Sequence, residues 1–224
     1  DPLIGSGISS LLSDATRMIF LESPGSLTME LQDLPAIVAV AKAKRIVTVI
    51  DDTWSAGVLM NPLEMGVDLS IQALTKYQSG HSDALAGAIL TRRPELARRL
   101  KQASQHIGFG TSSEDASLVL RGLRSLTLRL NQHGRSSLAV AAAFRALPGV
   151  TAILHPALPE HPQNALYKRD FTGPAGLFSI VVEQALLDRV NAFLNRLQLF
   201  GLGFSWGGFE SLVIPCNPQL NRTA

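Results

Sequence analysis

Polar residues that could carry out chemistry gather in two short segments, each directly after an apolar stretch. The first, residues 50–54 (IDDTW), carries the carboxyl groups of Asp51 and Asp52. The second, residues 75–83 (TKYQSGHSD), carries an amine, an imidazole and a carboxyl group. A lysine that follows a buried strand can be held away from water, where its pKa falls and its amine becomes nucleophilic. Lys76 is therefore a candidate for covalent bonding to a carbonyl compound.

An acidic residue at the end of a neighbouring strand would complete one specific chemistry. A carboxylate can hold and protonate a pyridine nitrogen while a lysine binds the aldehyde of the same ring, which is how enzymes use pyridoxal phosphate. Asp51 would take the first role and Lys76 the second. Most lysines after strands lie on the surface, and a lone aspartate usually caps a turn. Spacing alone therefore leaves a pyridoxal-phosphate site as one of two hypotheses.

The second hypothesis is a divalent metal site built from the same segments. Asp51, Asp52 and Asp83 offer oxygen ligands, and His81 offers an imidazole, a set that suits a metal-dependent hydrolase. Spacing does not exclude this site, because ligands from separate loops can converge. The single cysteine, Cys216, gives neither a zinc-site spacing nor an intramolecular disulfide.

The surrounding stretches predict an α/β fold. Residues 46–50 (IVTVI) are apolar and β-branched, which is typical of a strand buried on both faces of a parallel sheet. Asp33 and Pro35 predict the start of a helix that ends near residue 43. Further strands are predicted at residues 17–22, 69–73 and 84–91. Ligands on such sheets bind at the carboxyl ends of strands, where both polar segments lie.

The second half of the chain has a different pattern. Residues 94–147 predict helices that are broken near residue 108. The remainder predicts short strands at residues 150–154, 177–182 and 212–214, around one helix near residues 186–197. We place a domain boundary near Gly122, inside the helical region.

Charge and hydropathy exclude several classes of protein. The 224 residues include 20 basic and 18 acidic side chains, a net charge of +2, without a long basic run. Nothing therefore indicates binding to nucleic acid or to an anionic membrane. No apolar run reaches the length of a membrane span, and no signal peptide opens the chain. A cytoplasmic location is the expectation.

Four segments, in the correct order, resemble signature sequences of the transsulfuration (Cys/Met metabolism) family of pyridoxal-phosphate enzymes. They are the Glu-Ser-Pro segment at residues 22–26, the aspartate motif at 49–54, the cofactor-lysine motif at 75–83 and the interdomain stretch at 121–126 (RGLRSL). The resemblance covers essentially the whole chain.

The resemblance implies roles for individual residues. Lys76 would hold the cofactor, Asp51 would contact its ring nitrogen and Thr75 would bind its phosphate, with no metal in the site. Two positions depart from the family pattern. Asp52 stands where Asn is usual, and Ala73 where many relatives have a phosphate-binding serine.

The implied fold is that of the PLP-dependent transferases, the aspartate aminotransferase fold type I, truncated at both ends. The boundary at Gly122 then separates a partial PLP-binding large domain, residues 1–122, from an incomplete C-terminal α/β domain, residues 123–224. The resemblance places the family's glycine-rich phosphate loop and ring-stacking tyrosine upstream of Asp1, and its substrate-carboxylate arginine beyond Ala224. We therefore expect a fragment.

Three segments resemble the β-lyase branch of the family in particular: residues 22–30, 168–173 and 205–211. Trp206 stands where other branches commonly have leucine. The resemblance implies a carbon–sulfur lyase that converts L-cystathionine to homocysteine, pyruvate and ammonia by β-elimination, with cysteine desulfhydrase activity also open. Ser205 and Trp206 would shape the carboxylate side of the substrate pocket.

Three alternatives stay open. One is a γ-synthase or γ-lyase of the same family, and another is the metal-dependent hydrolase that uses Asp51, Asp52, His81 and Asp83. A third is that the isolated chain is inactive. For the full-length parent the resemblance implies small-molecule substrates, L-cystathionine or L-cysteine, and a homotetramer built as a dimer of dimers.

Overall fold

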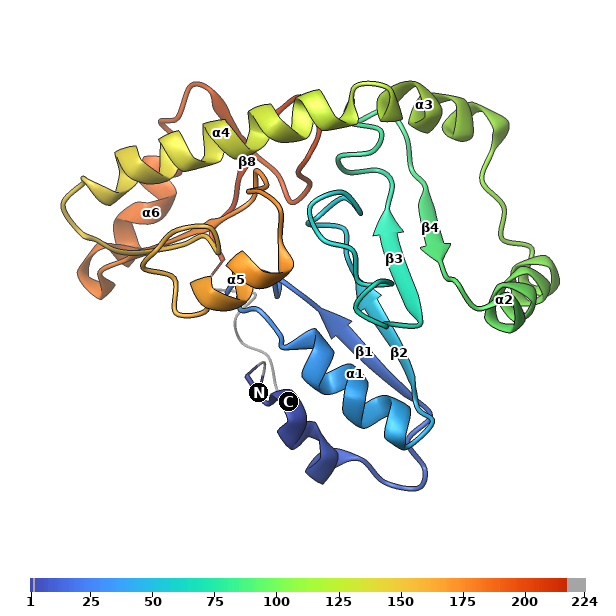
Figure 1. Cartoon of the computed structure of the whole chain (residues 1–224). Helices are drawn as coiled ribbons and strands as arrows, with labels where there is room; N and C mark the ends of the chain where they lie inside the picture. Colours follow the sequence, from blue (N-terminus) through green and yellow to red (C-terminus); the bar gives the residue numbers. More distant parts are fainter. Residues whose placement is uncertain (2, 217–224) are drawn as a thin grey trace.

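The computed structural model describes residue 1 and residues 3–216. A four-stranded sheet lies at the centre of the N-terminal half (Figure 1). Its strands, in spatial order, are β1 (Met18–Glu22), β2 (Val47–Asp51), β3 (Leu69–Ala73) and β4 (Gly87–Leu90). β1, β2 and β3 run parallel, as predicted, whereas β4 runs antiparallel to β3. The reversal follows from the connection, because residues 74–86 form turns and irregular backbone instead of a crossover helix.

Helix α1 (Leu34–Ala43) covers one face of the sheet. Asp33 caps it as predicted, and the Asp33 carboxylate accepts a hydrogen bond from the Ala36 backbone N–H at 3.4 Å. A short 3₁₀ helix, η1 (Gly5–Leu11), precedes β1. The main hydrophobic cluster joins α1 to β1 and β2 and continues into the C-terminal half; its members include Ile19, Leu21, Leu34, Ile37, Ile50, Tyr167 and Phe171.

The opposite face of β1 is open. Met18 and Phe20 are 54% and 57% exposed, whereas Ile19 and Leu21 are 7% and 3% exposed. Successive side chains of a strand point to opposite faces of a sheet, so Met18 and Phe20 share the face away from α1.

The predicted helical region consists of α2 (Pro94–Ile107), α3 (Ser113–Leu123) and α4 (Leu126–Arg145). The break near residue 108 is confirmed: Gly108 adopts a φ of 78°, a left-handed conformation that favours glycine and ends α2. In Figure 1, α4 extends from α3 across to the C-terminal elements. None of the helices in the described part of the chain combines the length and the apolar character that crossing a membrane requires.

The described residues that follow α4 form two small sheets. β5 (Val150–Leu154) pairs with β6 (Ser179–Val182) in antiparallel fashion, and β7 (Phe200–Leu202) pairs with β8 (Ser211–Val213) in parallel. In the same described stretch, the helices are α5 (Asn164–Asp170), η2 (Gln184–Leu186) and α6 (Leu187–Leu194). The sequence pattern did not predict α5 or β7, which are short. The boundary placed near Gly122 falls in the last turn of α3, and it stays a prediction.

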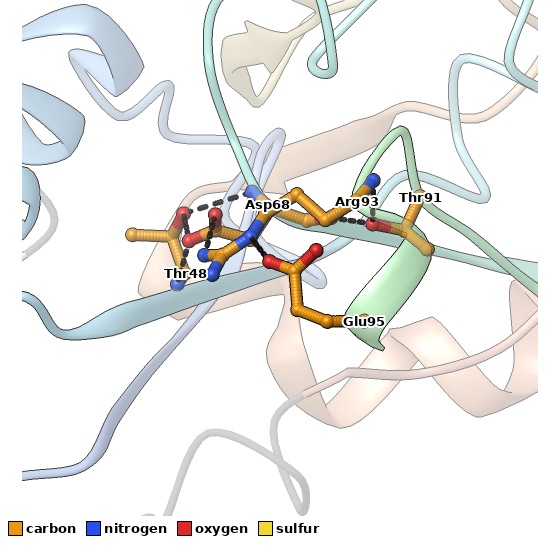
Figure 2. A network of polar contacts seen from close by, with 5 residues as sticks. All are labelled: Thr48, Asp68, Thr91, Arg93 and Glu95. Atoms are coloured by element: carbon orange, nitrogen blue, oxygen red, sulfur yellow. Dashed lines mark hydrogen bonds and ion pairs between the residues drawn. The ribbon is translucent and has the colours of Figure 1, made fainter. Parts of the chain in front are cut away.

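Asp68 ties several elements together at the start of β3 (Figure 2). Its Oδ2 accepts from the Thr48 backbone N–H at 2.9 Å and from the Thr48 hydroxyl at 3.1 Å. Its Oδ1 accepts from Arg93 Nη1 at 2.7 Å, and Arg93 Nε also donates to Glu95 at 2.6 Å. The Thr91 hydroxyl donates to the Asp68 carbonyl at 2.7 Å. β2, β3, the end of β4 and the start of α2 are thereby joined.

Replacing Asp68→Asn is expected to lower the free energy of unfolding by about 2 kcal/mol near neutral pH, because it removes a charge-assisted hydrogen bond and mismatches the donors around it. Burial acts to raise the pKa of Asp68, but the hydrogen bonds from Thr48 and Arg93 outweigh it and hold the pKa below its ordinary value. The stabilisation is therefore complete above the ordinary pKa of 3.8 and is lost as the pH falls through the folded-state pKa.

Urea unfolding between about pH 5 and about pH 2 measures this difference. The effect of Asp68→Asn should shrink as the pH falls, while Asp14→Asn, at an exposed position, should change little at any pH. An Asp68→Asn effect of constant size would contradict the assignment.

Candidate active site

The two polar segments follow neighbouring parallel strands. β2 ends at Asp51 and β3 ends at Ala73, and the register pairs Asp51 with Ile71. The carboxyl ends of parallel strands meet at one edge of a sheet, so the structure confirms that both segments start from the same edge.

Lys76 points toward the C-terminal half. Its side chain is partly buried, and Nζ donates a hydrogen bond to Ser205 Oγ at 3.0 Å. Nζ also lies 5.5 Å from the centroid of the Trp206 ring, within range of a cation–π interaction. Burial lowers the pKa of the Lys76 amine. The three residues predicted for the catalytic and substrate-binding roles are therefore neighbours, although 129 positions separate Lys76 from Ser205.

We call residues 74–80, which carry Lys76, the lysine turn. The loop that carries Ser205 and Trp206 fits closely against this turn. The Trp206 and Tyr77 rings lie 5.3 Å apart with an interplanar angle of 64°. Gly207 adopts a φ of 79°, and a Cβ at this position would lie 2.9 Å from the Tyr77 backbone nitrogen. Glycine therefore lets the loop pass close to the residue after Lys76. The Ser82 hydroxyl adds a second link by donating to Glu210.

Tyr77 anchors the turn, and sequence reasoning missed it. The side chain is 1% exposed, and its hydroxyl accepts a hydrogen bond from the Gly176 backbone N–H at 2.7 Å. Burial raises the pKa of Tyr77, so the hydroxyl stays protonated at neutral pH. A fully buried tyrosine beside a lysine fixes the backbone from which the amine extends.

The two aspartates at the end of β2 lie in different environments. Asp51 is partly buried, and its Oδ1 accepts from the Thr53 backbone N–H at 3.0 Å. Asp52 is fully buried, and its carboxyl group accepts from the Ser55 hydroxyl and from Gln72 Nε2, the latter at 2.9 Å. Burial raises the pKa of Asp52 to about 7. Of the two carboxyl groups, only that of Asp51 belongs to a residue with accessible surface, and its role toward a cofactor stays a prediction.

A chain of side-chain amides connects Asp52 to the lysine turn. Gln72 on β3 donates to Asp52, and Gln78 Nε2 donates to Gln72 Oε1 at 2.9 Å and to the Ala56 carbonyl at 3.2 Å. We call Asp52, Gln72 and Gln78 the amide chain. Sequence reasoning did not identify it, although a glutamine inside a predicted buried strand was a usable signal.

Thr75 is hydrogen bonded to Ala86, the residue directly before β4. Its hydroxyl accepts from the Ala86 backbone N–H at 3.1 Å and donates to the Ala86 carbonyl at 3.3 Å. To donate a hydrogen bond to a phosphate, this hydroxyl would give up the longer of the two bonds, the one that it donates to the Ala86 carbonyl.

The structure does not gather the four residues of the metal-site hypothesis. His81 is exposed and its Nδ1 contacts the Ser79 carbonyl at 2.6 Å, while Asp83 pairs with Arg121 at 2.7 Å. In the described part of the chain, no group of three or more His, Cys, Asp or Glu side chains is arranged to hold a metal ion. His81 and Asp83 order the loop after the lysine turn.

Curated relatives with assigned names are similar in sequence to this chain. The chain is 44% identical to the cystathionine beta-lyase of Salmonella typhimurium and 43% identical to that of Escherichia coli, in each case over 98% of this chain and 56% of the relative. The chain thus spans about half the length of the curated relatives it matches.

Comparison of structures gives the same family. A cystathionine gamma synthase from Xanthomonas oryzae pv. oryzae, solved with aminoacrylate and cysteine, superposes with a TM-score of 0.88 at 33% identity over 95% of this chain and 55% of that protein. The family model described as Cys/Met metabolism PLP-dependent enzyme matches residues 1–222. The arrangement of Lys76 and Asp51 at adjacent strand ends and this match lead to one conclusion: the chain belongs to the Cys/Met metabolism family of PLP-dependent enzymes.

Proposed function

We propose that the protein containing this chain is a PLP-dependent carbon–sulfur lyase that acts on L-cystathionine by β-elimination. The observation that carries the proposal is the partly buried Lys76 amine, which follows β3, next to the strand that ends in Asp51. The names of the Salmonella typhimurium and Escherichia coli relatives support the choice of substrate.

The residues present fit pyridoxal phosphate. An amine whose pKa is lowered by burial suits an aldehyde, and the Asp51 carboxylate suits a pyridinium nitrogen. Lys76 would hold the aldehyde, Asp51 would keep the ring nitrogen protonated and Thr75 would bind the phosphate. When bound, the cofactor supplies an acceptor for the electrons that the substrate releases at Cα.

Lys76 would then act on protons of the substrate. Its Nζ would remove the proton from Cα and deliver a proton to the sulfur that leaves Cβ. The lowered pKa of Lys76 favours the unprotonated amine that the first step requires. Ser205 and Trp206 would orient the substrate by shaping the pocket around its carboxylate. With water, the products are homocysteine, pyruvate and ammonia; from L-cysteine the sulfur product is sulfide.

A γ-synthase or γ-lyase activity is the second candidate, and the likeness to the Xanthomonas oryzae synthase is the observation that favours it. Trp206, whose ring centroid lies 5.5 Å from Lys76 Nζ, argues for β-elimination. By the family resemblance, it stands where the γ-type branches commonly have leucine. A cytoplasmic location and a homotetramer of two dimers belong to the proposal for the whole protein.

Purified protein from the complete reading frame is expected to show a visible absorbance band from cofactor bound to Lys76. Lys76→Ala is expected to abolish this lysine-dependent band. Activity should fall about 10³-fold or more, since the variant loses its proton-transfer group. Lys101→Ala, at an exposed position on α2, is the matched control and should behave as the unaltered protein.

The products decide between the two candidates. Homocysteine and pyruvate from L-cystathionine support β-elimination, whereas cysteine and 2-oxobutyrate would replace this proposal with γ-elimination. If Lys76→Ala keeps the same visible absorbance band as the unaltered protein, both candidate activities are overturned.

Asp52→Asn is expected to raise the free energy of unfolding above neutral pH. Because burial raises the pKa of Asp52 from 3.8 to about 7, the folded protein binds a proton that the unfolded chain releases, and stability falls as the pH rises between these values. Asparagine keeps an oxygen acceptor for the amide chain and does not titrate. The gain can reach about 4 kcal/mol, since one pKa unit corresponds to about 1.4 kcal/mol.

Urea unfolding midpoints measured from about pH 5 to about pH 8 test this effect. The slope of stability against pH should flatten in Asp52→Asn and stay unchanged in Asp188→Asn, an exposed position at the start of α6. Identical slopes in Asp52→Asn and the unaltered chain would show that the Asp52 carboxyl group does not titrate in this range.

A further inference from the structure

One arginine of α4 holds the turn that carries Lys76. Arg129 Nη1 donates to the Tyr77 carbonyl at 2.7 Å. Its Nη2 donates to the Gly122 carbonyl at 2.8 Å and to the Gln78 carbonyl at 3.4 Å. A single guanidinium group therefore bridges the lysine turn and the end of α3.

The arginine is itself fixed in place. Its side chain is half-buried, and Nε donates to the Ser125 hydroxyl at 3.0 Å. The planar guanidinium group offers five N–H donors in a rigid arrangement, and here they meet carbonyls of two separate chain segments. All the acceptors named are neutral, so the Arg129 guanidinium group here binds backbone carbonyls instead of a carboxylate.

Two glycines make this close approach possible. Gly80, at the end of the turn, has a φ of 68°, and a Cβ there would collide with the Arg129 guanidinium group. A Cβ at Gly122 would collide with the carbonyl oxygens of Gln78 and Ser79. The turn therefore sits directly on the junction of α3 and α4, with no side chain between them.

The same turn sets the origin of the Lys76 side chain. The Lys76 backbone N–H donates to the Ala73 carbonyl at 3.0 Å, and the Lys76 carbonyl accepts from the Gly80 N–H at 2.9 Å. With the next two carbonyls held by Arg129, the backbone is fixed on both sides of the lysine. A small displacement of this backbone would move Nζ away from Ser205.

We propose that Arg129 is a positioning residue for Lys76, which fixes the turn and thereby sets the place and the burial of the amine. This rests on the proposed function for its catalytic consequence, but the positioning itself can be measured without cofactor. A misplacement of about 1 Å at a reacting group costs about 10²-fold in rate, so the effect on catalysis is large enough to detect.

The first experiment measures the amine in cofactor-free protein. Acetylation of Lys76 by acetic anhydride is followed against pH by mass spectrometry, with exposed Lys101 as internal reference. Arg129→Gln should move the titration of Lys76 to higher pH relative to Lys101, because a loosened turn exposes the amine to water and relieves the burial that lowers its pKa. Arg129→Lys keeps the charge but not the planar group, and it should show a smaller shift in the same direction.

The second experiment uses the cofactor-loaded protein from the complete reading frame. Arg129→Gln should lower kcat about 10²-fold with little change in KM, and Arg129→Lys should recover about tenfold of the loss. Arg135→Gln, at an exposed position of the same helix, is the matched control and should match the unaltered protein in both experiments. Circular dichroism establishes that each variant is folded, and Arg129→Lys carries the test where Arg129→Gln does not fold.

The outcomes separate the two proposals. If folded Arg129 variants leave the Lys76 titration and kcat unchanged, Arg129 does not position the lysine. If the titration shifts but the unaltered protein shows no lysine-dependent visible band, the positioning stands and the proposed enzymatic function fails.

Discussion

Burial of a turn is the constraint on which the rest of the site depends. Residues 77–80 are buried, yet they form a turn, so their backbone polar groups must find partners inside the protein. The Ser79 N–H donates to the Leu74 carbonyl at 2.9 Å, and the Ser79 hydroxyl donates to the Thr75 carbonyl at 2.9 Å. Arg129 supplies the donors that the turn itself does not. The result is a partly buried amine on a fixed stretch of backbone.

The neighbouring polar groups show that this arrangement costs stability. Asp52 is a fully buried carboxyl group, and burial disfavours its charged form. Gln78 Oε1 is buried and has no hydrogen-bond partner among the described residues. An unpaired buried polar atom costs about 1–3 kcal/mol. The amide chain therefore contributes order around the lysine turn more than it contributes stability, as is common where a protein holds polar groups for chemistry.

Local sequence patterns were sufficient for the strands that carry the site. The β-branched run at residues 46–50 predicted β2, because burial on both faces leaves a continuous apolar pattern. Residues 69–73, in which apolar and polar residues alternate, predicted β3. The direction of β4 was not predictable in the same way, since it depends on the path of the connection. Family resemblance favoured cofactor roles for Lys76 and Asp51, whereas spacing alone left these roles undecided against a metal site.

Long-range partners of the site could not be predicted from local pattern. Arg129 reads as an ordinary helical arginine, and Tyr77 reads as one aromatic residue in a polar loop. Their roles come from contacts with Gly122, Gly176 and the turn carbonyls, which lie far away in the sequence. A short helix such as α5 escaped prediction because seven residues carry too little periodicity to be distinguished from a turn.

The hydrophobic cluster that crosses from one half of the chain to the other has a thermodynamic consequence. Tyr167 and Phe171 pack with Ile19 and Leu21 in one cluster. Hydrogen bonds cross in the same direction: Gln163 bonds both backbone groups of Leu31, at 2.9 Å and 2.7 Å. Segments that share a core lose their stability together. Unfolding of this chain should therefore be cooperative across residue 122, and the amine should lose its surroundings in the same transition that melts the sheet.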